Sequence, residues 1–353
     1  MSKINNEMLN ALRRENLTPD VLTTTPPKIS RCFGRIWYNM IKALHAVHVE
    51  FHLIFKLLCQ RGQAVYRPIN GGYGQIYDVI YLFTCRILKS NIFIHHHSFN
   101  YLNSYSRLFR LLLVAAGGRV THVVLGEKMK ADLCTRYSLN PANIIIVSNL
   151  AFFDNANSFE HWAGKSLVLG HLANLSVEKG VDDFISVCRA LSDAGISFKG
   201  VIAGPISDAG SSSLIEAACL EMRQVEYIGP VYGDAKVEFF RSLDIFVFLS
   251  KYKNEAEPLV LYEAAEHGVF LIGTERGCMA PVIKSLHGFV VEDCSDTVSE
   301  VVLEIYNIID GDVLTCDARE YRRGLFNAMR SQAAGNLKAL INLMGEKFVS
   351  GPV

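Results

Sequence analysis

Glu255 and Glu263 stand eight positions apart in the segment SKYKNEAEPLVLYEAAEHG, with a proline and an apolar run between them. Glu255 follows an expected strand at 244–249, and Pro258 suits the first turn of the helix that comes next. This first turn has amides without helical partners, and the helix dipole makes that end positive. These amides lie near Pro258, Leu259 and Val260. The segment therefore predicts an anion site flanked by two carboxylates, each able to accept hydroxyl groups.

Three consecutive histidines end an expected strand at 91–97. Alternation along a strand places His95 and His97 on one face and His96 on the other, so the three cannot converge on one metal ion. His48 and His52 are four positions apart on an expected helix, a spacing that fits a metal. Because no carboxylate or cysteine completes that set, a polar helical stripe is the preferred interpretation, and no metal site is predicted.

Short β-branched runs alternate with helical patterns along most of the chain, which predicts an α/β protein with parallel sheets. The first series of expected strands comprises 21–25, 64–67, 91–97, 120–125 and 144–147. The second comprises 166–172, 196–203, 225–228, 244–249, 269–273 and 288–291. Residues 317–348 have a helical pattern, with Gly324 and Gly335 as weak points.

The alternation of expected strands and helices is interrupted once, and this interruption divides the chain into two domains. The expected domains are 1–150 and 166–316, joined by a linker at 151–165 and followed by C-terminal helices at 317–353 that can pack back toward the first domain. The fold class is therefore two Rossmann-like, doubly wound domains facing a cleft. Ligands of such sheets bind at the carboxyl ends of the strands.

Composition excludes several classes of protein. The 353 residues include 35 Lys plus Arg and 35 Asp plus Glu, so the chain lacks the basic excess of a nucleic-acid binder. Half of the residues are hydrophobic, which argues against disorder. Nine scattered cysteines favour a reducing compartment. The sequence lacks an apolar signal segment and a membrane-spanning stretch, so a cytoplasmic location is expected.

Several motifs carry a resemblance to a known family. EAEPLVLYEA (255–264) resembles the E-x7-E motif of retaining glycosyltransferases. Four further stretches match in order and spacing: LANLSVEKGVDDFI (172–185), VIAGP (201–205), VEYIGPVYGDAKVEFFRSLDIFVFLS (225–250) and HGVFLIGTERGCMAPVI (267–283). The chain thus resembles glycosyltransferase family 4, the glycosyl transferases group 1, most strongly over 165–310.

The resemblance implies the GT-B fold and a metal-independent hexosyltransferase without a cofactor. Its donor is a nucleotide-diphosphate sugar, and its acceptor is a glycan or a lipid-linked saccharide, with cell-surface polysaccharide synthesis as the context. The implied catalytic residues are His97 near the reacting carbon, Glu255 at the donor sugar and Lys179 at the departing phosphates. Glu263 would bind the ribose, and the helix start at 258–260 would share the phosphates with Lys179.

Further residues follow from the same resemblance. Gly204 and Gly229 are expected at the nucleotide, and Gly34 and His95 on the acceptor side. Asn174 joins the donor site in place of the arginine usual in the family, and Glu257 replaces a phenylalanine. Residues 106–119 mix arginines with an apolar face, which leaves peripheral contact with the inner face of the membrane open, although a helix covering a sheet is preferred.

Two alternatives remain beside the transferase. A sugar-nucleotide 2-epimerase of the same fold would share the nucleotide site, and a catalytically impaired, partner-dependent homologue would fit the changes at Asn174 and Glu257. A Rossmann oxidoreductase is disfavoured, since neither series of strands opens on a GxGxxG turn.

Overall fold

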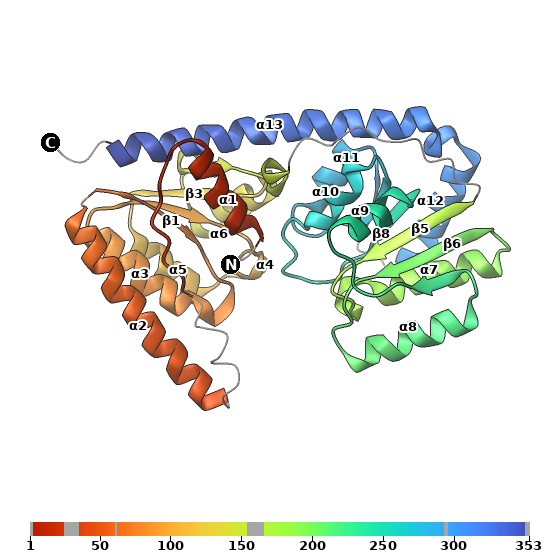
Figure 1. Cartoon of the computed structure of the whole chain (residues 1–353), viewed down its shortest axis with the longest axis horizontal. Coiled ribbons are helices and arrows are strands. Elements are labelled where there is room, and N and C mark those ends of the chain that lie inside the picture. Colours follow the sequence, from red (N-terminus) through yellow and green to blue (C-terminus); the bar gives the residue numbers. More distant parts are fainter. Residues whose placement is uncertain (1–2, 25–34, 61, 154–165, 293–295, 350–353) are drawn as a thin grey trace. The chain divides into compact units, whose positions relative to one another are not determined.

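The computed structural model describes residues 3–24, 35–60, 62–153, 166–292 and 296–349 (Figure 1). The chain forms two compact units. Unit 1 comprises residues 1–152 and 333–353, and unit 2 comprises residues 153–332. Of the expected linker at 151–165, residues 154–165 lie outside the described part of the chain.

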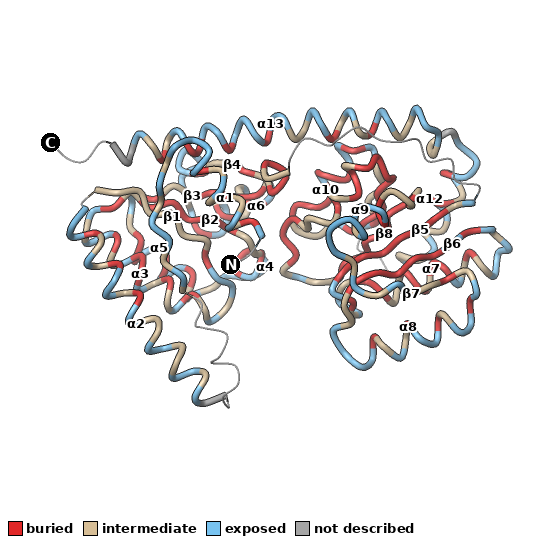
Figure 2. Tube along the Cα trace, in the orientation of Figure 1, coloured by how far each residue is buried: buried red, intermediate tan, exposed pale blue. Residues whose placement is uncertain are grey.

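Unit 2 is built on a six-stranded parallel sheet in the order β10-β9-β8-β5-β6-β7. Its strands are β5 (Leu167–Leu172), β6 (Phe198–Ala203), β7 (Val225–Tyr227), β8 (Ile245–Phe248), β9 (Phe270–Thr274) and β10 (Phe289–Val291). Every residue of β8 and β9 is buried, as expected of strands covered on both faces (Figure 2). The strand order reverses between β5 and β8, so the carboxyl ends of these two strands form the switch point where ligands of such sheets bind.

Helices connect the strands of unit 2. They are α7 (Val181–Asp193), α8 (Ala209–Glu221), α9 (Asp234–Arg241), α10 (Leu259–Glu266), α11 (Met279–Ser285) and α12 (Thr297–Asp310). Short 3-10 turns, η5 (Val177–Lys179) and η6 (Asp312–Leu314), precede α7 and follow α12. Two aspartates occupy the first turn of α7, where negative charge stabilises a helix.

Unit 1 holds a four-stranded parallel sheet in the order β1-β2-β3-β4. The strands are β1 (Ala64–Pro68), β2 (Asn91–His95), β3 (Val120–Val124) and β4 (Ile144–Ile146). The helices are α1 (Lys3–Arg14), α2 (Arg35–Cys59), α3 (Gln75–Ile87), α4 (Asn100–Asn103), α5 (Arg107–Ala116) and α6 (Glu127–Tyr137). Three 3-10 turns are η2 (Gly72–Gly74), η3 (Pro141–Asn143) and η4 (Asn149–Phe152). Helix α5 buries Phe109 and Leu112, so the stretch 106–119 does contribute a helix to the core of this unit.

The expected first strand at 21–25 is wrong for residues 21–24, which form no regular structure. Two side chains of α2 contact this segment instead. His45 Nε2 donates to the carbonyl of Thr23 at 2.9 Å, and Lys56 pairs with Asp20 at 2.6 Å. The segment therefore lies beside a helix, where its backbone is not paired with a strand.

Two helical features differ from expectation. Helix α1 was not predicted, although Ile4, Met8 and Leu12 lie four residues apart and are buried. The C-terminal stretch forms one continuous helix, α13 (Cys316–Val349), and neither Gly324 nor Gly335 interrupts it. A single glycine costs a helix only about 1 kcal/mol relative to alanine, which the remaining turns offset. The residues from Ala333 onward belong to unit 1.

Candidate active site

Lys179 and Glu255 form a direct ion pair at the switch point of the unit 2 sheet. Lys179 Nζ lies 2.5 Å from Glu255 Oε2, and the Ser250 hydroxyl donates to the same oxygen at 3.0 Å. Lys179 follows β5 and Glu255 follows β8, so neighbouring strands bring together residues that are 76 positions apart. Glu255 is buried, whereas a quarter of the Lys179 side chain is exposed. The ammonium can therefore turn toward an incoming anion.

Aromatic and backbone contacts hold this lysine in place. Its ammonium lies 4.7 Å from the ring centroid of Tyr252, a cation–π contact. The turn that ends in Lys179 is closed by Gly180, whose φ of +82° is left-handed. A Cβ at Gly180 would come within 2.2 Å of the Leu249 carbonyl oxygen. Glycine at this position thus permits the loops after β5 and β8 to touch.

Glu263 pairs with a lysine that sequence reasoning missed. Lys236 on α9 lies 2.5 Å from Glu263 Oε2, and the Glu263 side chain is 13% exposed. Each acid of the E-x7-E pair is therefore matched by one lysine, Lys179 or Lys236. Nothing in the local sequence marks Lys236, although consecutive βα units do place α9 beside α10.

The start of α10 is open. Pro258 is its N-cap residue in extended conformation and makes no side-chain capping bond, and residues 258–260 are partly exposed. Pro258 thus gives the amides of the first turn no side-chain acceptor, and the helix dipole favours an anion there. Pro258 is the N-cap residue and not, as expected, the first residue of the helix. The expected anion site therefore begins one residue later, at Leu259.

Glu257 is engaged inside the fold. The Tyr262 hydroxyl donates to Glu257 Oε1 at 2.7 Å, and both residues are buried. One oxygen of this carboxylate is thus stabilised by a hydroxyl donor. Asn174, at the position where the resemblance expects an arginine, is exposed.

Gly204 and Gly229 lie together at the ends of β6 and β7. The amide of Gly204 donates to the carbonyl of Gly229 at 2.9 Å, and the Tyr227 hydroxyl donates to the Gly204 carbonyl at 2.9 Å. Gly204 has a φ of +121°, and a Cβ there would lie 1.9 Å from the Ala173 carbonyl oxygen.

We expect Gly204→Ala to lower the free energy of unfolding by at least about 2 kcal/mol, because the backbone strain and the clash with Ala173 add. Urea denaturation measures this change. Gly195→Ala is the matched control, since Gly195 also has positive φ (+73°) but no atom within 4 Å of its Cβ position. Equal losses in both variants would contradict the role of close packing at Gly204.

The histidines of unit 1 separate by face, as alternation predicts. The rings of His95 and His97 contact one another, with centroids 3.9 Å apart and planes tilted by 43°, and the Tyr66 hydroxyl hydrogen-bonds to His95 Nδ1. On the other face, His96 hydrogen-bonds to the Tyr101 hydroxyl at 2.8 Å and to His122 at 3.0 Å.

These rings are neutral in the folded protein. Burial lowers the pKa of His97 to about 4 and holds those of His95 and His96 well below the usual value. Within the described residues, Nε2 of His95 and Nε2 of His97 are buried without a hydrogen-bond partner. Two buried imidazole nitrogens at the carboxyl end of β2 thus lack a partner among the described residues.

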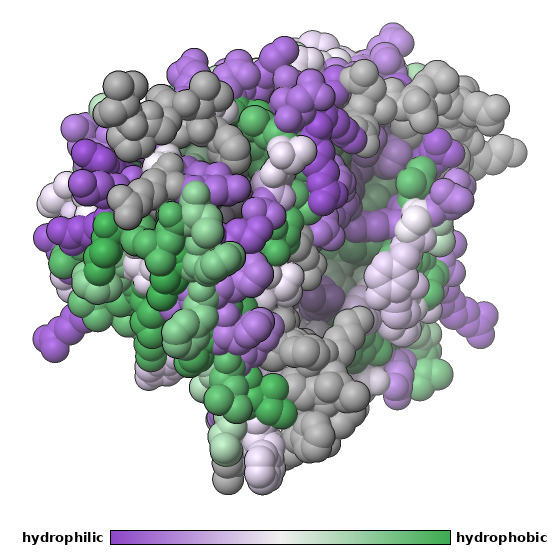
Figure 3. All heavy atoms as spheres, turned by 60° about the vertical axis from the view of Figure 1, so that its left-hand side comes forward, coloured by the Kyte–Doolittle hydropathy of each residue, from purple (hydrophilic) through white to green (hydrophobic). Residues whose placement is uncertain are grey.

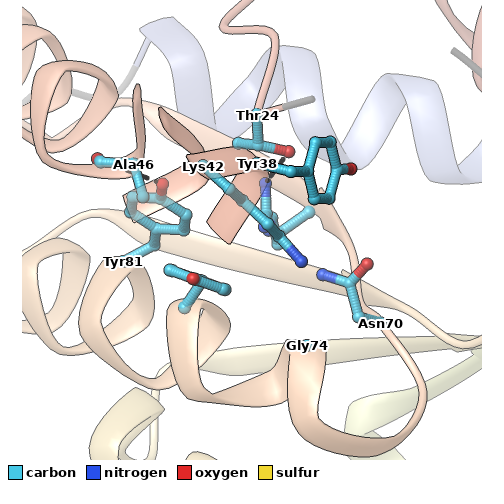
Figure 4. Close-up of a pocket in the computed structure, with 9 residues that line it drawn as sticks. Thr24, Tyr38, Lys42, Ala46, Asn70, Gly74 and Tyr81 are labelled. Atoms are coloured by element: carbon cyan, nitrogen blue, oxygen red, sulfur yellow. Dashed lines mark hydrogen bonds between the residues drawn. The ribbon is translucent and has the colours of Figure 1, made fainter. Parts of the chain in front are cut away.

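A pocket of about 160 Å³ lies between α2, α3 and the loop after β1 (Figure 4). Figure 4 shows the Lys42 side chain extending from α2 toward Asn70, with Tyr38 and Tyr81 nearby. The Lys42 ammonium lies 5.3 Å from the Tyr77 ring centroid. A second cation in the lining, Arg67, is already paired with buried Asp78 at 2.9 Å. The aromatic rings and the Lys42 cation suit a sugar ring or an anion.

All of the expected donor-side residues lie in unit 2, where Lys179 contacts Glu255 and Gly204 contacts Gly229. The expected His95 and His97 contact one another in unit 1. Gly34 lies outside the described residues. Among the residues that are described, no three His, Cys, Asp or Glu side chains gather as metal ligands. Ser250 and Tyr252, which contact the central ion pair, were missed because loop conformation decides their position.

Comparison with known proteins finds a family match within unit 2. Residues 153–311 match the family described as Glycosyl transferases group 1. This stretch is a glycosyl transferases group 1 domain. The resemblance found in the sequence is confirmed at that level.

The chain is also similar to individual known proteins, one by sequence and two by structure. The gpi3 subunit of phosphatidylinositol N-acetylglucosaminyltransferase from Schizosaccharomyces pombe is 25% identical over 218 residues, or 60% of this chain. TarM of S. aureus, crystallised with fondaparinux, alpha-GlcNAc-glycerol and UDP, matches with a TM-score of 0.64, 17% identity and 83% of this chain covered. Anabaena Alr3699/HepE in complex with UDP matches with a TM-score of 0.65, 13% identity and 96% covered. The chain therefore has the GT-B fold.

The lengths of the relatives differ from that of this protein. The chain spans 47% of the yeast subunit and 58% of the TarM chain, but 88% of the HepE chain.

Proposed function

We propose that the protein is a retaining glycosyltransferase that moves a sugar from a nucleotide-diphosphate sugar to a glycan or lipid-linked acceptor in cell-surface polysaccharide synthesis. One observation carries this proposal. A largely buried cation, Lys179, pairs with the buried carboxylate of Glu255 at the switch point of the sheet, within the stretch that matches the group 1 family.

The donor site follows from these charges. Lys179 and the open start of α10 neutralise the diphosphate, and Glu263 accepts the two ribose hydroxyls after Lys236 turns away. Glu255 orients the hydroxyls of the donor sugar. UDP in the TarM and HepE complexes supports a nucleotide donor.

The chemical step is a front-face displacement. The acceptor hydroxyl oxygen bonds to the anomeric carbon as the bond from that carbon to the phosphate oxygen breaks, and the hydroxyl proton passes to the departing phosphate. Lys179 stabilises the negative charge that develops on the leaving group. The configuration at the anomeric carbon is thereby retained.

The acceptor side belongs to unit 1 in this proposal. His97 lies near the reacting carbon as a neutral hydrogen-bonding group, and His95 supports its ring. The pocket beside Lys42 and Tyr77 receives part of the acceptor.

A cytoplasmic location is part of the proposal. The seven cysteines in the described part of the chain are free thiols, which fits a reducing compartment. In that part of the chain, no helix combines the length and the apolar character needed to cross a bilayer.

The test is an incubation with UDP-glucose and UDP-N-acetylglucosamine, with and without a cell-derived fraction of glycans and lipid-linked saccharides. Release of UDP that depends on the acceptor fraction supports sugar transfer. Interconversion of the donor without acceptor would assign the epimerase instead. Absence of binding by any nucleoside diphosphate would assign the catalytically impaired homologue, for which exposed Asn174 is the favouring observation.

We expect sugar transfer to continue after treatment with EDTA, within about twofold of the untreated rate, because Lys179 and the helix start supply the positive charge. The rate of UDP release measures this. Activity that disappears with EDTA and returns with Mg²⁺ or Mn²⁺ would contradict metal independence.

A further inference from the structure

Helix α2 carries two apolar stripes, and only one of them is buried. Val49, Leu53 and Leu57 are buried in unit 1. Seven large apolar side chains form the other stripe, at spacings of three and four residues, and each is about half exposed or more. They are Trp37, Met40, Leu44, Val47, Phe51, Phe55 and Leu58. A stripe with helical period needs a partner, and this one has none within the described residues.

Helix α3 extends the same apolar surface. Ile76, Ile80, Phe83 and Ile87 repeat at spacings of four, three and four, and each is at least 50% exposed. The two helices contact one another, and the Tyr81 hydroxyl donates to the Ala46 carbonyl at 3.2 Å. Figure 3 shows apolar side chains gathered on this side of the molecule. We call these eleven side chains the α2–α3 face.

The α2–α3 face is larger than the exposed apolar patches that are usual on monomeric proteins. Half-exposed side chains of this size each show on the order of 100 Å² of apolar surface, so eleven exceed the few hundred Å² usual for a monomer. Exposed apolar residues of unit 2, such as Leu220 and Leu303, lie singly on separate helices. The concentration on α2 and α3 therefore indicates an interaction surface.

The net charge of the segment that carries the α2–α3 face indicates which kind of partner binds it. Residues 35–116, which contain α2, α3 and α5, hold nine lysines and arginines but only two carboxylates, a net charge of +7 in a chain that is neutral overall. Neither carboxylate is exposed: Glu50 accepts a hydrogen bond from Thr84, and Asp78 is buried against Arg67. Counting Asp20, the ion-pair partner of Lys56, leaves +6. An apolar face amid unbalanced positive charge matches an anionic phospholipid surface. A second copy of the chain would instead bring like charges together.

We propose that unit 1 docks on an anionic lipid bilayer through the α2–α3 face, with α2 lying in the plane of the interface. The apolar stripe enters the boundary between head groups and acyl chains, while exposed cations of this segment, such as Lys89 and Arg107, contact lipid phosphates. This rests on the proposed function in one respect, since it favours a lipid-linked acceptor over a soluble glycan.

The experiment is vesicle flotation of the full chain, without donor or acceptor. The wild type should float with vesicles of phosphatidylcholine mixed with phosphatidylglycerol, and far less with phosphatidylcholine alone. Phe51→Glu combined with Phe55→Glu should lower the bound fraction at least about tenfold, because two charges enter the interface. Leu220→Glu, at an 86% exposed position on α8, should leave flotation unchanged.

Three results would overturn the proposal: no flotation of the wild type with anionic vesicles at low salt, flotation of the double variant equal to wild type, or an equal loss in Leu220→Glu. A vesicle-independent dimer that only the double variant abolishes would assign the face to a second copy. Both exposed positions tolerate substitution, and thermal unfolding checks that the variants fold. Nucleotide binding by the double variant should stay at the wild-type level, which separates this test from that of the proposed function.

Discussion

Lys179→Met lowers the turnover of sugar transfer by about 10²–10³-fold, because the variant loses the cation that stabilises the departing diphosphate. In the free protein this ammonium lies 2.5 Å from Glu255, so the substitution also leaves a buried carboxylate with only the Ser250 hydroxyl. Initial rates of UDP release at saturating donor measure the effect. Thermal unfolding measures the separate cost to stability.

Two further variants isolate the charge on Lys179. Lys179→Met with Glu255→Gln removes the unpaired carboxylate, and its turnover should remain as low as that of the single variant. Lys199→Met breaks the exposed pair with Glu226 in the same unit and should keep the wild-type rate. Turnover of Lys179→Met within about threefold of wild type would rule out its role at the leaving group.

Acidification should unfold the protein over a narrow range below pH 6.5. Burial lowers the pKa of His97, His122, His171 and His267 to about 4, and those of His95 and His96 lie well below the usual value. In the unfolded chain these groups titrate near 6.5. Between pH 6.5 and 4 the unfolded state therefore binds protons that the folded state does not.

The stability that these histidines contribute is complete above pH 6.5 and is lost as the pH falls toward 4. Each contributes about 1.4 kcal/mol per pH unit below 6.5, so six together remove about 12 kcal/mol by pH 5, comparable to the whole stability of a domain. Glu50, Asp183 and Asp244 oppose this, because burial raises their pKa values, but they are three groups against six.

Urea denaturation at pH 7.5, 6.5 and 5.5 tests the expectation. The denaturation midpoint should fall steeply between the last two values. His122→Asn, which removes one buried imidazole beside His96, should make this dependence shallower. A midpoint that stays constant from pH 7.5 to 5.5 would show that the folded histidines titrate normally.

The sequence predicted the strands of unit 2 within a few residues, because strands such as β8 and β9 are continuous apolar runs between turn residues. It failed at Val21, where a short β-branched run is held beside α2 by His45 and Lys56. Local composition cannot tell a paired strand from an extended segment on a helix. Which of the two forms depends on whether a strand or a helix lies next to the segment in the fold.

The donor-side residues could be predicted as a group, because all of them follow strands of one parallel sheet. The ion pairs Lys179–Glu255 and Lys236–Glu263 could not, since they depend on loop conformation and on side chains from different helices. The exposure of one stripe on α2 could not be predicted either, because apolar residues spaced by three and four positions do not show which face of the helix is buried.

The binding of UDP to the full chain, measured by titration calorimetry, tests most directly whether unit 2 holds the donor through Glu263. The wild type should bind, and Glu263→Gln should bind at least about tenfold more weakly, since the ribose hydroxyls lose a charged acceptor. Glu226→Gln, which alters an exposed acid paired with Lys199, should bind as the wild type does. Equal affinity of Glu263→Gln and wild type would contradict the account.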